Sequence, residues 1–190
     1  VSAFLSVASK AAGFVALVVL IYTAFPLSEA IWQPFIWVLS ALTMTIGNVL
    51  ALKQKNIVRM IAYSSISQGG FVLMPLAVAG LVGSGSTALR SVVLYMIVYA
   101  ATNLGIFAVI LAVSSKTRSG DVSSFGGLFS YAPALGVLMT LFLASLAGIP
   151  PLGGWFAKFA AFEALVSAET GWGYSLAIIG GINSVVAFGY

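Results

Sequence analysis

Residues 134–168 read ALGVLMTLFLASLAGIPPLGGWFAKFAAFEALVSA, a long apolar run that is interrupted once. The interruption is Gly148-Ile-Pro150-Pro151-Leu-Gly-Gly154, and Lys158 follows it within a few residues. In hydrocarbon a helix satisfies its own backbone groups, and a broken helix is tolerated only where it is buried or lines water. The stretch therefore predicts either one membrane helix broken near Pro150-Pro151 or two helices joined there by a loop.

The rest of the chain has the same composition. Of its 190 residues, 61% are hydrophobic and 6% are charged, whereas soluble domains carry about 25% charged residues. A transmembrane helix needs about 20 apolar residues, and the apolar stretches lack the alternation of an outer-membrane barrel. We therefore predict an all-α, polytopic transmembrane bundle of about six to seven spans, which excludes a secreted domain, a cytosolic enzyme and a nucleic-acid-binding protein.

The turn and loop residues divide the chain into apolar stretches. The expected stretches are 1–25, 31–52, 57–82, 87–114, 134–149, 155–168 and a last one from Trp172, with a flexible turn at 83–86 and the longest loop at 116–133. The first and last stretches reach the two ends of the sequence. We therefore expect residues 1–190 to be a partial transmembrane domain, truncated at both ends, of a longer membrane protein.

Two residue types are absent from the sequence. It has no cysteine and no histidine, so disulfides, iron–sulfur clusters, a histidine-ligated haem and most zinc sites are excluded. We expect this chain to bind no metal and no cofactor.

The basic residues indicate how the bundle lies in the membrane. If the spans alternate in direction, Lys53, Lys55 and Arg59 lie on the same side as Lys116 and Arg118. Cytoplasmic loops carry an excess of lysine and arginine, so we expect this side to face the cytoplasm.

Two lysines fall inside apolar stretches. Lys10 lies near the middle of the first stretch, where a lysine costs about 2.5–3.5 kcal/mol on insertion scales. Lys158 follows the break, and charged residues inside spans usually face a bundle interior or a wet cavity. Each has a plainer interpretation: Lys10 extends to the interface, and Pro150-Pro151 is an ordinary loop. If both lysines are buried, their amines can gain and lose protons near neutral pH, as a proton relay requires.

Polar side chains within the spans are candidates for holding water between the lysines. They are Asn48, Tyr63, Ser64, Ser65, Ser67, Gln68, Tyr95, Tyr99, Thr102 and Asn103. We favour Gln68, Ser67, Tyr63, Tyr99 and Asn103 as relay support. For each of them, an ordinary hydrogen bond between helices is the plainer alternative.

Several strings resemble one family of membrane proteins. They are Ala8-Ser9-Lys10, Gly47-Asn48-Val-Leu-Ala-Leu52, Asn56-Ile-Val-Arg59-Met-Ile-Ala-Tyr63-Ser64-Ser65-Ile-Ser-Gln68, Asn103-Leu-Gly105 and Ser145-Leu-Ala-Gly148-Ile-Pro150-Pro151-Leu-Gly-Gly-Trp-Phe-Ala-Lys158. Together they resemble the antiporter-like subunits of bacterial NADH:quinone oxidoreductase, respiratory complex I. The loop string Ser123-Ser-Phe-Gly-Gly-Leu-Phe-Ser-Tyr131 favours the subunit N branch.

The resemblance implies a fold and a function. The family has two inverted five-helix repeats, each with a broken helix, and this chain would form most of the second repeat. Lys10 matches the family's central-axis lysine, and Lys158 matches the lysine at the second broken helix, near the periplasmic exit. The subunit would carry no redox group, because other subunits use NADH and quinone. Its partners would be the other membrane subunits and the lipid bilayer, without nucleic acid, in the bacterial plasma membrane.

The sequence departs from the family's pattern at two positions. Val58 stands where relatives often carry a lysine, and Gln68 stands where they often carry a histidine. A glutamine can hold a water molecule but takes no proton at neutral pH. A relay here would therefore have to run through water and hydroxyl groups.

Three functions fit these features. The first is a proton-translocating membrane subunit of complex I that relays protons through Lys10 and Lys158. The second is a subunit of a multisubunit cation/proton antiporter, and the third is a scaffold bundle without transport.

Overall fold

The computed structural model describes residues 2–80 and 85–190, and the described residues form helices and connections without a regular strand. The longer helices are α1 Ser2–Ala24, α2 Glu29–Ala51, α3 Ile57–Leu73, α4 Gly85–Thr117, α6 Pro133–Ala147, α7 Gly153–Ser167 and α8 Gly171–Val186. Between or after them lie η1 Met74–Val78, η2 Val122–Phe125, α5 Leu128–Tyr131 and η3 Ala187–Gly189. Among the described residues, five helices are long and apolar enough to cross a membrane. The all-α membrane bundle is confirmed.

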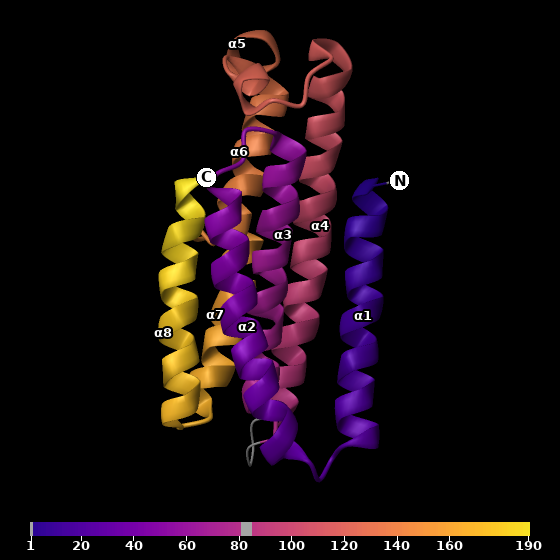
Figure 1. Cartoon of the computed structure of the whole chain (residues 1–190). Coiled ribbons are helices and arrows are strands. Elements are labelled where there is room, and N and C mark those ends of the chain that lie inside the picture. Colours follow the sequence, from indigo (N-terminus) through magenta and orange to yellow (C-terminus); the bar gives the residue numbers. More distant parts are fainter. Residues whose placement is uncertain (1, 81–84) are drawn as a thin grey trace.

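The long helices run side by side along one direction, with α3 in the middle of the bundle (Figure 1). Most residues of Ile57–Val78 are buried, whereas few residues of α1 are. The helix α2 packs along α3 and α8, and α4 packs against α1, α3, α6 and α7. The span that contains α3 thus lies inside the bundle, while α1 lies at the edge of the described bundle.

Two glycines allow α2 and α3 to approach closely. A Cβ at Gly47 would lie 2.6 Å from the backbone nitrogen of Ser67, and a Cβ at Gly70 would lie 2.5 Å from Cγ of Met44. The Ser40 hydroxyl donates to the Gly70 carbonyl at 2.8 Å across the same contact. In a bilayer, close packing and such hydrogen bonds replace the hydrophobic drive between helices. This contact fixes the central helix α3.

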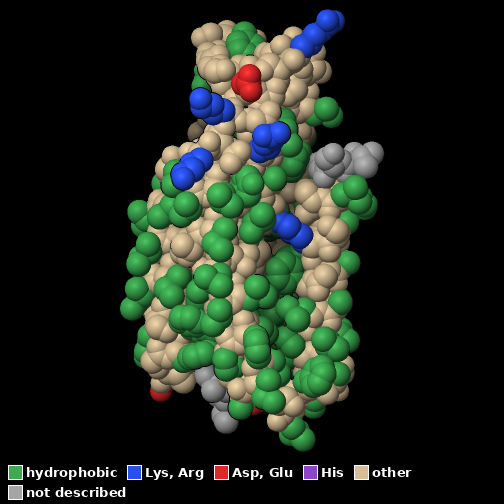
Figure 2. Space-filling view, viewed as in Figure 1, with side chains coloured by type: hydrophobic (Ala, Val, Ile, Leu, Met, Phe, Trp, Pro, Cys, Tyr) green, Lys and Arg blue, Asp and Glu red, His purple; other side chains and the backbone are tan. Residues whose placement is uncertain are grey.

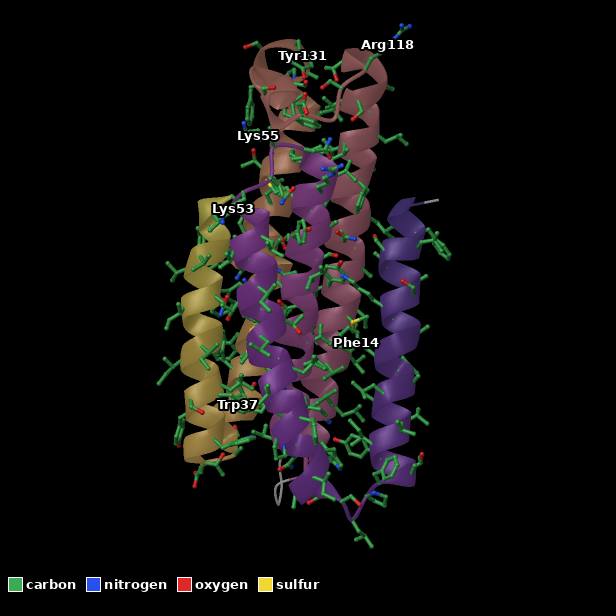
Figure 3. All side chains as sticks on the ribbon, in the orientation of Figure 1. Phe14, Trp37, Lys53, Lys55, Arg118 and Tyr131 are labelled. Carbon is green, nitrogen blue, oxygen red and sulfur yellow. The ribbon has the colours of Figure 1, made fainter. Side chains whose placement is uncertain are left out.

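Most of the lysine and arginine side chains visible in Figure 2 lie toward one end of the bundle. The backbone nitrogen of Ile57 donates to the Gly120 carbonyl at 2.8 Å, and that of Val122 donates to the Lys55 carbonyl at 2.9 Å. These bonds join the turn before α3 to the loop after α4. Lys53, Lys55 and Arg118 accordingly lie toward the same end of the bundle, and Trp37 lies toward the other (Figure 3).

The segment after the longest loop forms two helices placed end to end. In Figure 1, α6 descends from the end that carries the basic residues, and α7 continues in the same direction below it. The helix α4 packs against both of them, as expected if they follow one another along its length. The arrangement is that of a broken helix, and it differs from a loop between antiparallel neighbours.

Some predicted boundaries are wrong. The span expected over 57–82 covers Ile57–Val78, and its α-helix ends at Leu73 and becomes the 3₁₀ helix η1, because Pro75 lacks an N–H and its ring clashes with the preceding turn. The helix α4 begins at Gly85 and includes two residues of the turn expected at 83–86, while residues 81–84 lie outside the described part. The loop expected at 116–133 is shorter, because α4 continues to Thr117 and the short helices η2 and α5 occupy part of it.

Candidate functional site

The break between α6 and α7 is built by glycines and by one serine. Gly148 ends α6 with a left-handed φ of 95°, a conformation that glycine adopts without a Cβ penalty. The backbone nitrogen of Gly154, in the first turn of α7, donates to the Ser145 hydroxyl at 3.0 Å. The Cβ of any larger residue at position 154 would overlap the Ser145 carbonyl. The two half-helices are therefore held in close contact.

Lys158 turns back from α7 onto the end of α6. Its Nζ donates to the Ala147 carbonyl at 2.7 Å, and it lies 4.7 Å from the centre of the Phe71 ring on α3. The residue is 5% exposed. The last carbonyls of a helix lack intrahelical partners and carry partial negative charge, so the C-terminus of α6 is a favourable place for an ammonium group. Lys158 thus lies inside the bundle at the break.

Gln68 on α3 binds the neighbouring carbonyl of the same helix end. Its Nε2 donates to the Leu146 carbonyl at 3.3 Å, and its Oε1 accepts from the Tyr95 hydroxyl at 2.5 Å. Gln68 and Tyr95 are both buried. The amide therefore links α3, α4 and the end of α6, and Lys158 and Gln68 bind adjacent carbonyls.

Lys10 reaches α3 from the helix α1. Its Nζ donates to the Ser65 carbonyl at 2.6 Å and to the Ser65 hydroxyl at 2.5 Å, and it lies 5.6 Å from the centre of the Tyr99 ring. The side chain is half-buried and directed into the bundle. This geometry differs from that of a lysine that extends to the interface. Ser65 is three residues from Gln68, which binds the carbonyl next to the one that Lys158 binds, and Lys158 itself contacts α3 at Phe71.

The other predicted support residues divide into two groups. Tyr99 lies by Lys10, and Asn103 donates from Nδ2 to the Ser6 hydroxyl of α1 at 3.0 Å. Ser67 is buried against α2 at Gly47, which places it away from the lysine contacts. Tyr63 is half-buried, and none of the hydrogen bonds within residues 2–80 and 85–190 joins it to either lysine. The structure therefore brings together Lys10, Lys158, Gln68 and Tyr99 but leaves Ser67 and Tyr63 outside.

A second buried polar cluster contains two residues that the sequence analysis did not single out. Asn48 donates from Nδ2 to the Asn183 carbonyl at 2.8 Å and to its Oδ1 at 3.0 Å. The Tyr190 hydroxyl donates to Oδ1 of Asn48 at 2.9 Å and lies 3.2 Å from the Ser64 hydroxyl. The asparagine within the apolar stretch that begins at Trp172 was the available signal. The cluster joins α2, α3 and the end of α8.

Two small cavities adjoin the break. One of about 10 Å³ is lined by Gln68, Tyr95, Val98, Tyr99, Thr102, Ser145, Leu146, Gly154 and Ala157. The other, of about 40 Å³, is lined by Ile61, Ser64, Gln68, Leu143, Leu146, Ala147, Ala187 and Tyr190. A buried water needs about 10–15 Å³ and two to four polar partners. Gln68 and Leu146 border both cavities, so Gln68 separates two places that can hold water.

The described residues contain no group of three or more histidine, cysteine, aspartate or glutamate side chains that could hold a metal ion.

Known proteins share this sequence and fold. The chain is 42% identical over its whole length to NADH-quinone oxidoreductase subunit N of Trichlorobacter lovleyi. It is 43% identical, again over its whole length, to NAD(P)H-quinone oxidoreductase subunit 2 of Rippkaea orientalis. It spans 37% and 35% of the lengths of these relatives.

Solved structures of membrane complexes contain chains with a similar fold. A chain of respiratory complex I from Thermus thermophilus matches 83% of this chain with a TM-score of 0.69 and 26% identity, over 34% of its own length. A chain of the Mrp complex from Dietzia sp. matches 84% of this chain with a TM-score of 0.74 and 23% identity, over 28% of its own length, and shows the fold alone.

A family model described as NADH:quinone oxidoreductase/Mrp antiporter, transmembrane, matches residues 1–185. On this match, and on the relatives with about 40% identity over the whole chain, the protein belongs to the NADH:quinone oxidoreductase/Mrp antiporter transmembrane family.

Proposed function

We propose that this chain belongs to the membrane-arm subunit N of NADH:quinone oxidoreductase and translocates protons through Lys10 and Lys158. The observation that carries the proposal is that both amines lie against α3 inside the bundle: Lys10 binds Ser65, and Lys158 binds the end of α6 beside the Phe71 ring. Ser65, which binds the Lys10 amine, is the ninth residue of the 22-residue span Ile57–Val78. Gln68, whose amide binds the carbonyl next to the one that Lys158 binds, is the twelfth residue of this span. Both amines are therefore held near the middle of the membrane layer.

A relay follows from this geometry. The Tyr99 ring lies beside the Lys10 amine, and Tyr99 also lines the 10 Å³ cavity together with Gln68. One water in that cavity would connect the surroundings of Lys10 to the break. Because Gln68 takes no proton at neutral pH, it orients water and the α6 carbonyls, while the amines carry the exchanged proton.

The proposed topology has six crossings, with α6 and α7 together forming one interrupted crossing. The chain would then form most of the second inverted repeat of the subunit. The five continuous spans and the end-to-end placement of α6 and α7 support this assignment. The end that carries Lys53 and Arg118 would face the cytoplasm of a bacterial cell, with the chain in the plasma membrane.

The rest of the enzyme would supply the redox chemistry. In this proposal NADH and quinone react in other subunits, this chain binds no cofactor, and its partners are the neighbouring membrane subunits and lipid. The relatives with about 40% identity are named as quinone oxidoreductase subunits, which supports the assignment. The family description also includes Mrp antiporters, so a cation/proton antiporter subunit is the alternative.

The test replaces Lys158 with alanine in the full complex, reconstituted in proteoliposomes. We expect proton pumping to be lost and NADH oxidation to fall with it. Lys53→Ala, which removes an exposed lysine, is the matched control, and Lys158→Met separates loss of charge from loss of packing. Unchanged pumping and oxidation in both Lys158 variants would refute the role and leave a scaffold bundle. Sodium-dependent transport that needs no NADH would favour the antiporter.

A further inference from the structure

The ring of Phe71 forms one wall around the Lys158 amine. The Nζ of Lys158 lies 4.7 Å from the ring centre, and a Cβ at Gly148 would lie 3.5 Å from the same atom. An ammonium group within about 6 Å of a ring centre is attracted by the negative face of the ring, most strongly where water is excluded. Lys158 is buried and Phe71 is fully buried, so bulk solvent does not screen this contact.

None of the carboxylates in residues 2–80 and 85–190 forms an ion pair with Lys158, and Glu163, the acidic residue nearest to it in sequence, is exposed. The helix α7 packs against α3, α4, α6, α8 and η1. The titratable side chains on these neighbouring elements are Arg59, Tyr63, Arg90, Tyr95, Tyr99, Lys116 and Tyr174. Of these, Tyr95 and Tyr99 are buried, and an ordinary phenol is uncharged at neutral pH. The charge of the Lys158 amine is therefore met by the Ala147 carbonyl and the Phe71 ring, without a buried negative side chain.

The Phe71 ring is held in place by its neighbours. It stacks on the Tyr95 ring, with the two centres 6.4 Å apart and the two planes 9° apart. The Tyr95 hydroxyl donates to Oε1 of Gln68, which lies three residues before Phe71 on α3. Groups that are fixed toward a charge before it forms need no reorganisation when it forms. The stack therefore keeps one face of the Phe71 ring toward the amine.

We propose that Phe71 is a positioning residue of this site, whose ring face takes the place of a carboxylate counter-ion and stabilises the charged form of Lys158. The inference rests on the proposed function and adds a residue to it. A buried carboxylate would bind the ammonium group as a closed ion pair, whereas the weaker contact with a ring leaves the amine able to release its proton. In the plainer alternative the lysine stem only packs on an apolar surface, and the electron density of the ring does not matter.

The first test changes the face of the ring and keeps its shape. Phenylalanine analogues with one, two and three fluorines are incorporated at position 71 in the full complex, because each fluorine withdraws electron density from the ring face. An ammonium group that is less stabilised loses its proton at lower pH. We therefore expect the alkaline limb of the pH profile of pumping to move to lower pH with each fluorine, by about 0.4–1.5 units in total.

The same analogues at Phe107 of α4 are the matched control. The Phe107 ring packs against the core, and neither of the cation–ring contacts in the described part of the chain involves it. We expect the alkaline limb to stay in place in these control complexes. An unchanged limb across the series at position 71, with pumping lost in Lys158→Ala, would overturn the role of Phe71 and leave the proposed function standing.

The second test does not depend on pumping. The trifluorinated analogue is placed at position 71 both in the parent complex and in Lys158→Met, and the assembled fraction is measured in denaturant titration at neutral pH. This double-substitution cycle isolates the interaction between the ring and the amine. We expect fluorination to shift the assembly equilibrium about 2- to 30-fold more in the parent than in Lys158→Met. Equal shifts in the two backgrounds would show that the ring only packs against the lysine and would refute the proposal.

Discussion

Gly154→Ala tests whether the break depends on direct backbone contact between its two half-helices. The added Cβ would overlap the Ser145 carbonyl, and the backbone cannot rotate away as a flexible side chain can. To relieve the overlap, α7 must move away from the end of α6. That movement also lengthens the bond from the Gly154 nitrogen to the Ser145 hydroxyl and carries Lys158, one turn further along α7, away from Ala147.

The magnitude follows from three contributions. Overpacking costs about 1–3 kcal/mol, and a weakened hydrogen bond costs about 1 kcal/mol. The greater helix propensity of alanine offsets about 0.5–1 kcal/mol. The net cost of about 1–3 kcal/mol corresponds to about a 5- to 150-fold shift in the folding equilibrium.

Gly181→Ala is the matched control, because a Cβ at that position of α8 meets nothing within 4 Å. We expect it to leave the complex as stable as the parent or slightly more stable. The assay measures the fraction of complex that stays assembled through a temperature series in detergent, together with the protons pumped per NADH oxidised. If Gly154→Ala matches Gly181→Ala in both measurements, the half-helices are not held by this contact.

Two further substitutions test the buried polar groups. Gln68→Leu leaves the Tyr95 hydroxyl and the Leu146 carbonyl without their side-chain partner, and each unpaired buried group costs about 1–3 kcal/mol. We expect a lower midpoint of thermal disassembly than in Gln54→Leu, because the amide of Gln54, in the turn after α2, binds only the Leu50 carbonyl of that helix. Equal midpoints would contradict the assignment of Gln68 as a link between helices. Asn48→Ala removes three hydrogen bonds to Asn183 and Tyr190, about 0.6 kcal/mol each. Asn48→Ala should therefore destabilise the complex by about 2 kcal/mol in denaturant titration. The control Thr43→Ala loses only a hydrogen bond within α2 and should not destabilise it. If the two variants are equally stable, the cluster adds no stability.

The membrane class and most helix boundaries could be predicted from local sequence. Runs of about 20 apolar residues have one solution in hydrocarbon, the helix, and the turns at Lys53 and Pro133 mark where runs end. The change from α3 to η1 within the span Ile57–Val78 does not follow from hydropathy, because hydropathy does not report the N–H that Pro75 lacks. The longest loop was overestimated because η2 and α5 are too short to show a helical period.

The candidate site was predictable only in part. Two lysines in apolar stretches are conspicuous because a charge there is costly. Residues 64–68 carry several polar side chains that face different neighbours around the helix, and the sequence does not show that Ser67 packs against α2 at Gly47. Asn183 and Tyr190 were missed because they are far from Asn48 in sequence, and only packing makes them its partners.

The sequence alone determined that this protein is a helical membrane bundle with a break before Lys158, because hydrophobicity, proline and glycine act locally on the backbone. Tertiary structure decided whether Pro150-Pro151 breaks one helix or forms a loop between two helices. It also decided where the amines of Lys10 and Lys158 point. The end-to-end packing of α6 and α7 against α4 exposes the last carbonyls of α6 to Lys158 and Gln68. Those carbonyls become partners only when the helices assemble, so the chemistry of the site belongs to the packed bundle.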